Sequence, residues 1–122
     1  MPQRKGDPVA VTKDEGIRPD TTAQSLSALR PAFAKDGTIT AANASSISDG
    51  AAAVVMTRES VARAMGLPIV ARIVSHAAHA HEPGLFTTEP VPAIREALSK
   101  AGWSVEDVDL WEINEAFAVV PM

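Results

Sequence analysis

The residues best suited to chemistry stand near the end of the sequence, in the run Asn114-Glu115-Ala116-Phe117-Ala118. Asn114 directly follows residues 108–113, a mostly apolar segment of strand length that also contains Asp109 and Glu112. Open α/β sheets bind ligands at the carboxyl ends of their strands. An Asn amide can both donate and accept hydrogen bonds, so it can hold a water molecule or a carbonyl group. The residues alone leave open the simpler alternative, that Asn114 only caps a final helix.

Two other groups of polar residues have a chemical and a simpler interpretation. His76, His79 and His81 with Glu82 carry the side chains that bind zinc, but they equally suit a solvated strand end or loop, because a structural zinc site needs four well-placed ligands. Two carboxylates on either side of Asn114, Glu112 and Glu115, could act as an acid/base pair. Their simpler role is to receive backbone N–H groups at the start of a helix.

The elements that would position these residues follow from the hydrophobic pattern. Residues 1–48 are irregular and polar; after Asp20-Thr21-Thr22, which can cap a helix, apolar residues recur at helical spacing. From residue 49 onward, strands and helices alternate. The expected strands are 51–56, 69–75 and 108–113, with a further edge strand at 8–12, and the expected helices are 60–65 and 91–101, each followed by a glycine. This alternation predicts an α/β fold with a layered sheet.

Composition narrows the class of function. The chain has 122 residues, of which 46% are hydrophobic, and its net charge is -4. A negative charge argues against a nucleic-acid partner, because phosphates attract a basic surface. No apolar run reaches the roughly 18 residues of a membrane span. The sequence contains no cysteine and no N-terminal apolar signal region, which is compatible with a cytoplasmic protein.

Three motifs in order resemble those of thiolases, specifically acetyl-CoA acetyltransferases. The first is Gly37-Thr38-Ile39-Thr40-Ala41-Ala42-Asn43-Ala44-Ser45, followed by Asp49-Gly50-Ala51-Ala52-Ala53. The second passes from Ala101-Gly102-Trp103 to Asp109-Leu110-Trp111-Glu112, and the third is the Asn114 run itself. The resemblance extends from about Arg4 to Met122, nearly the whole chain.

The resemblance implies a role for individual residues. Asn114 matches the Asn that holds a water molecule in the oxyanion hole for the thioester oxygen, a group that stabilises developing charge. The implied substrate-binding residues are Ala116, Phe117 and Phe86 around the acyl pocket, Ala41, Ala44, Ser45 and Phe33 along the pantetheine arm, and Arg18 and Ser25 near the adenine of coenzyme A. Ser46 departs from the family pattern, because many relatives have Gly there.

The resemblance also shows what these residues lack. The nucleophilic Cys, the Gly-His-Pro histidine and the second Cys of thiolases have no counterpart here, and a Ser without an adjacent base is a poor nucleophile. We therefore expect the chain alone to be inactive, and to be truncated or completed by another chain. Residues 1–48 would form the end of a coenzyme-A-binding loop domain, and residues 49–122 the first part of a C-terminal α/β/α domain.

The implied reaction is the Claisen condensation of acetyl-CoA or its thiolytic reverse, as in fatty acid metabolism. Coenzyme A thioesters would be substrates, and the resemblance implies no metal or other cofactor. The implied assembly is a homo-oligomer, a dimer or tetramer. Two alternatives stay open at this point: a non-catalytic module that binds coenzyme A or docks onto a thiolase subunit, and an unrelated α/β domain with a capping Asn.

Overall fold

The computed structural model describes residues 1–122, which form two units, Met1–Arg30 and Pro31–Met122. The first unit contains the short helix α1 (Ala23–Ser27). Thr22 caps it as predicted: Thr22 Oγ1 accepts from Ser25 N at 3.1 Å, and Ser25 Oγ accepts from Thr22 N at 3.0 Å. The helix ends earlier than the apolar spacing suggested. Pro31 explains part of this, because the residue before a proline is disfavoured in helical geometry.

The second unit contains two α-helices and two short 3₁₀ helices. They are α2 (Glu59–Ala64), η1 (Pro83–Thr88), α3 (Pro90–Ala101) and η2 (Val105–Asp107). Both α-helices were predicted, and the predicted glycines follow them with left-handed φ angles of 63° at Gly66 and 70° at Gly102. The 3₁₀ helices were not predicted, because single turns carry no hydrophobic period.

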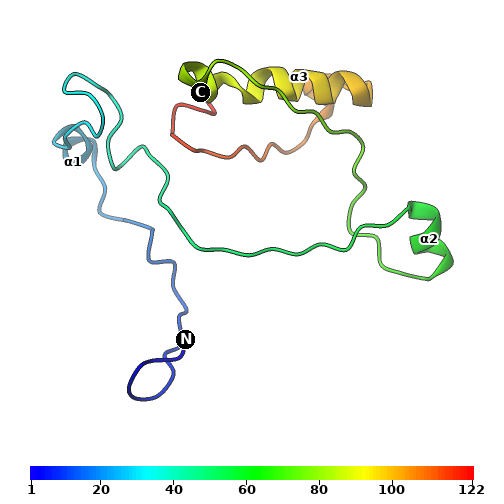
Figure 1. Ribbon diagram of the computed structural model, residues 1–122, viewed down its shortest axis with the longest axis horizontal. Helices are drawn as coiled ribbons and strands as arrows, with labels where there is room; N and C mark the ends of the chain where they lie inside the picture. The colour runs from blue at the N-terminus through cyan, green and yellow to red at the C-terminus, as the bar shows by residue number, and fades with distance from the viewer. The chain divides into compact units, whose positions relative to one another are not determined.

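The predicted strands have no hydrogen-bonded partner within the chain. Residues 51–56, 69–75 and 108–113 belong to no β-ladder, and Figure 1 draws them as coil. One isolated antiparallel bridge joins Ala44 to Phe117. A strand exists only as part of a ladder, so the layered sheet stays a prediction.

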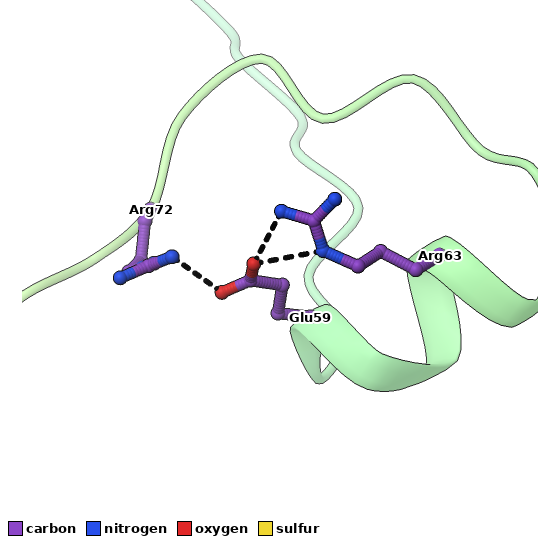
Figure 2. Close-up of polar contacts among 3 residues, drawn as sticks. All are labelled: Glu59, Arg63 and Arg72. Carbon is purple, nitrogen blue, oxygen red and sulfur yellow. Dashed lines mark hydrogen bonds and ion pairs between the residues drawn. The ribbon is translucent and has the colours of Figure 1, made fainter.

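An ion cluster fastens α2 to the chain that follows it (Figure 2). Glu59 Oε1 accepts from Arg63 Nε at 2.9 Å and from Arg63 Nη2 at 2.7 Å, one helical turn away. The other oxygen of Glu59 lies 2.7 Å from Arg72 Nη2, beyond the helix. Both arginine side chains are 68% exposed, so water screens these pairs and they orient the segment more than they stabilise it.

Helix α3 is the element against which the site is built. Ser75 Oγ donates to the Ala97 carbonyl at 2.7 Å, and Lys100 Nζ donates to the His76 carbonyl at 3.3 Å. Lys100 also forms an i,i+4 pair with Glu96 at 2.7 Å, which lowers the pKa of the Glu96 carboxyl. In Figure 1 the red C-terminal segment returns to the beginning of this helix.

Few apolar side chains are buried. Ala62 on α2, 6% exposed, is the one buried residue, whereas Val55, Val70 and Leu110 in the predicted strands are 96%, 98% and 90% exposed. Exposed apolar segments with unpaired backbone groups favour association with another chain. No helix in the structure combines the length and the apolar character that crossing a membrane requires.

We expect the isolated 122-residue chain to self-associate or to be marginally stable, because its apolar segments have no cover of their own. Sedimentation velocity over a concentration series measures this directly. A monomer at every concentration that also unfolds cooperatively would contradict the prediction.

Gly102→Ala should destabilise the end of α3 by about 1 kcal/mol, because an L side chain disfavours the left-handed φ. The Trp103 amide, which donates to the Leu98 carbonyl at 3.0 Å, should then exchange its hydrogen faster. Gly84→Ala is the matched control: a Cβ at either glycine meets nothing within 4 Å, but Gly84 has no positive φ. Equal effects of the two changes would contradict the backbone explanation.

Candidate functional site

The contact that creates the site joins two segments 70 residues apart. The Ser45 amide donates to the Ala116 carbonyl at 3.1 Å, and the Ala118 amide donates to the Asn43 carbonyl at 2.9 Å. The Ser45 hydroxyl adds a third bond by donating to the Glu115 carbonyl. These bonds surround the Ala44–Phe117 bridge, so two of the motifs found in the sequence lie against each other.

A cavity of about 340 Å³ opens beside this contact. It is lined by the end of η1 and the beginning of α3, together with the chain around Asn114. The lining residues are Phe86, Glu89, Pro90, Ile94, Glu112, Ile113, Asn114, Ala116 and Val120. Phe117 reaches its edge, where the ring packs edge-to-face on Phe86 with 5.7 Å between the ring centroids. Most of this lining is apolar, as in sites that bind small molecules.

Most of the predicted site residues in this unit meet here. Asn114, Ala116 and Phe86 line the cavity, and Phe117 contacts Phe86. Two residues predicted along the pantetheine arm, Ala44 and Ser45, pair with the Asn114 run. Ala41 lies in the turn just before them.

The remaining predicted residues do not line this cavity. Phe33 is 80% exposed, in the loop that precedes the Ala41 turn. Arg18 and Ser25 belong to the first unit, where the Ser25 hydroxyl is engaged in the cap of α1. Their contact with coenzyme A stays a prediction.

Asn114 does not cap a helix, because residues 118–121 form turns. Its exposed side chain lines the cavity, and its chemical role there stays a prediction. Glu112 also lines the cavity, whereas Glu115 contributes its backbone carbonyl to Ser45. The two carboxylates are therefore not placed as a pair in this cavity.

Sequence reasoning missed two residues that shape the site. Asn43 orders the turn before Ala44: its Oδ1 accepts from the Thr40 amide at 2.7 Å, and its Nδ2 donates to the Thr38 carbonyl at 2.9 Å. An Asn beside two alanines in a Thr-rich loop is a turn signal that could have identified it. Glu89 lines the cavity, and nothing in its sequence position indicated that.

The histidines lie beside the site without forming a cluster. The rings of His79 and His81 meet edge-to-face at 6.0 Å, and His81 Nδ1 accepts from the Glu82 amide at 2.8 Å. His79 Nε2 lies 3.9 Å from Glu89 Oε2. No group of three or more His, Cys, Asp or Glu side chains has a geometry that could hold a metal ion.

A second hollow, of about 610 Å³, lies between α2 and residues 66–72. Its charged lining is the cluster of Glu59, Arg63 and Arg72, in which the carboxylate already partners both guanidinium groups. None of the predicted site residues reaches it, so we place the site at the cavity beside Asn114.

Ser45→Ala should loosen the contact between the two motifs, because it removes the hydroxyl that donates to the Glu115 carbonyl. One such bond is worth about 1 kcal/mol, so the Ala118 amide should exchange its hydrogen about fivefold faster. Ser46→Ala, a neighbouring exposed hydroxyl, is the control. Equal exchange rates in the two variants would mean that the backbone bonds hold the contact alone.

The chain is similar in sequence to known proteins. A family model described as the thiolase N-terminal domain matches residues 1–60, and one described as the thiolase C-terminal domain matches residues 67–122. An acetyl-CoA acetyltransferase of Pseudomonas aeruginosa is 52% identical over 118 residues, and one of Chromobacterium violaceum is 55% identical over 118 residues. Each match covers 97% of this chain and 30% of the relative, so the chain spans about a third of the relatives' length.

Solved structures agree with the sequence comparison. The Bacillus anthracis acetyl-CoA acetyltransferase superimposes with a TM-score of 0.83 and 49% identity, over 89% of this chain and 28% of that one. A human mitochondrial 3-ketoacyl-CoA thiolase in complex with CoA gives a TM-score of 0.84 and 45% identity, over 91% of this chain and 28% of that one. The path of the chain is therefore that of a thiolase, and the chain belongs to the thiolase family.

Proposed function

We propose that residues 1–122 form part of an acetyl-CoA acetyltransferase, which condenses acetyl-CoA or cleaves 3-ketoacyl-CoA by thiolysis. The observation that carries the proposal is the contact between the two motifs. It places Ala44 and Ser45, the predicted pantetheine segment, directly against the run that contains Asn114. Relatives about half identical in sequence, with the name acetyl-CoA acetyltransferase, support the same reaction.

In this proposal each group at the cavity acts on a different part of a thioester. The Asn114 amide, directly or through a water molecule, donates a hydrogen bond to the thioester oxygen, whose negative charge grows in the transition state. The apolar walls, with Phe86 and Phe117 at the edge, exclude water from the acyl group. The segment at Ala44 and Ser45 follows the pantetheine arm, and Arg18 and Ser25 approach the adenine end.

The covalent step requires groups from outside these residues. A thiolase forms an acyl-cysteine, and the chain has no cysteine. We propose that the remainder of the enzyme supplies both cysteines and the histidine, and that coenzyme A thioesters are the substrates with no further cofactor. A human relative solved in complex with CoA is consistent with that substrate class.

The finer structural expectations belong to the same proposal. Segments 51–56, 69–75 and 108–113 would be strands of a layered α/β/α sheet in the complete enzyme, with residues 1–48 in the loop domain and 49–122 in the C-terminal half. Assembly as a dimer or tetramer and a cytoplasmic location stay predictions.

A chimera tests the proposal. Residues 1–122 replace the matching 118-residue region of the Pseudomonas aeruginosa relative, which supplies the rest of a thiolase. The chimera should catalyse thiolysis of acetoacetyl-CoA, and Asn114→Ala should lower its turnover number by about 10²–10³, because one oxyanion donor is lost. Coenzyme A affinity should change much less, since the donor acts mainly in the transition state.

Two controls interpret the result. Gln3→Ala removes an exposed amide that does not line the cavity, and it should leave turnover and affinity unchanged. The 122-residue chain alone should transfer no acetyl group. A chimera that folds and binds coenzyme A without turnover would refute the catalytic proposal in favour of a binding module, and unchanged turnover in Asn114→Ala would reduce Asn114 to a structural residue.

A further inference from the structure

Glu89 is the polar side chain at the cavity whose position the fold explains least. It is the N-cap residue of α3, where a side chain normally accepts a hydrogen bond from the first turn of the helix. Two of the three residues that follow, Pro90 and Pro92, have no backbone N–H to offer. The Glu89 side chain makes no capping hydrogen bond. The helix start therefore offers this carboxylate only the Val91 amide as a capping donor, and that hydrogen bond is not made.

One oxygen of that carboxylate is buried without a hydrogen bond. Glu89 Oε2 has no partner and is shielded from solvent, although the side chain as a whole is 22% exposed. The helix dipole favours a negative charge at this end of α3, but it does not fill the hydrogen-bonding capacity of the oxygen. A buried charged acceptor without a hydrogen bond raises the free energy of the folded state. We therefore expect a donor to reach it when a ligand is bound.

The ion-pair partner of this oxygen is too distant to donate a hydrogen bond. His79 Nε2 lies 3.9 Å from Glu89 Oε2, beyond hydrogen-bonding distance, and its side chain is 38% exposed. The second carboxylate that lines the cavity, Glu112, is an acceptor as well and cannot serve. The lysine on the same helix, Lys100, is already held by Glu96 and the His76 carbonyl.

The Glu89 side chain lines the same cavity as the residues proposed to hold the acyl group. Glu89 lines it together with Asn114, Phe86 and Ala116. If the proposed function holds, a thioester whose carbonyl is at Asn114 extends its acyl chain into this cavity. A largely apolar cavity whose acceptors include the carboxylates of Glu89 and Glu112 suits a chain that carries a hydrogen-bond donor, because a site built around a polar partner rejects the analogue that lacks it.

We propose that Glu89 is a specificity-determining residue, which accepts a hydrogen bond from a hydroxyl group on the acyl chain of the coenzyme A thioester. This inference rests on the proposed function and narrows its substrate class to hydroxylated short acyl groups. The carboxylate contributes binding and selection only; no covalent step or proton transfer passes through it.

The test compares paired substrates in the complete enzyme that carries residues 1–122. 3-Ketohexanoyl-CoA is compared with analogues that bear a hydroxyl group on the last or the next-to-last carbon. The readout is the ratio of kcat/KM for hydroxylated and plain substrate within one preparation, which does not depend on how much of the enzyme is folded. For one of the analogues the ratio should be about tenfold or more, as expected for a hydrogen bond to a charged acceptor.

Three variants separate this role from a structural one. Glu89→Leu removes the acceptor and should bring the ratio to about one. Glu89→Gln keeps an uncharged acceptor oxygen and should give an intermediate ratio. Glu96→Gln removes a carboxylate from the same helix that does not line the cavity, and it should leave the ratio unchanged.

The outcomes distinguish this inference from the proposed function. Turnover of the substrates with a ratio near one for both analogues overturns the inference alone, and leaves His79 or an ordered water molecule as the partner of Glu89. A high ratio that survives in Glu89→Leu also overturns it. Absence of turnover with every thioester overturns the proposed function, and this inference with it.

Discussion

The contact between residues 43–45 and 115–118 is the interaction on which the site depends. It is the one place where backbone groups far apart in sequence pair as in a sheet. Closing a loop of this length costs chain entropy, and a few hydrogen bonds offset only part of that cost. The packing of Phe117 on Phe86 adds apolar contact at the same point. Site formation and local folding are therefore the same event in this region.

Helix α3 provides the rigid support for that contact. It is the longest helix, and it is contacted by the Ser75 hydroxyl near its end and by η1, which carries Phe86, near its start. Its two prolines fix the backbone of the first turn and remove N–H donors. The Glu89 side chain just before this turn makes no capping hydrogen bond and lines the cavity.

The exposure of the remaining apolar segments agrees with the family comparison. A chain with one buried residue gains little from the hydrophobic effect, the main stabilising contribution in folding. Thiolase relatives are about three times as long, and superimpose closely on the described path. In the proposed complete enzyme the unpaired segments have neighbouring strands, and the backbone groups that stand alone here are paired there.

Local sequence determined the helices and their ends. Thr22 caps α1, Gly66 and Gly102 follow α2 and α3, and the Glu96–Lys100 pair forms, because caps, left-handed glycines and i,i+4 pairs depend on residues within one or two turns. The family motifs likewise indicated Asn114, Ala44 and Phe86 as candidates for one site.

Only the tertiary structure showed which distant segments meet. The sequence could not reveal that the Ser45 hydroxyl reaches the Glu115 carbonyl, or that Glu89 lines the same cavity as Asn114. The strands stay a prediction, since an apolar segment indicates only the tendency to pair, and a ladder requires a neighbour in space. Strand pairing and burial each require two segments in contact. They therefore depend on which distant parts of the chain meet in the folded structure.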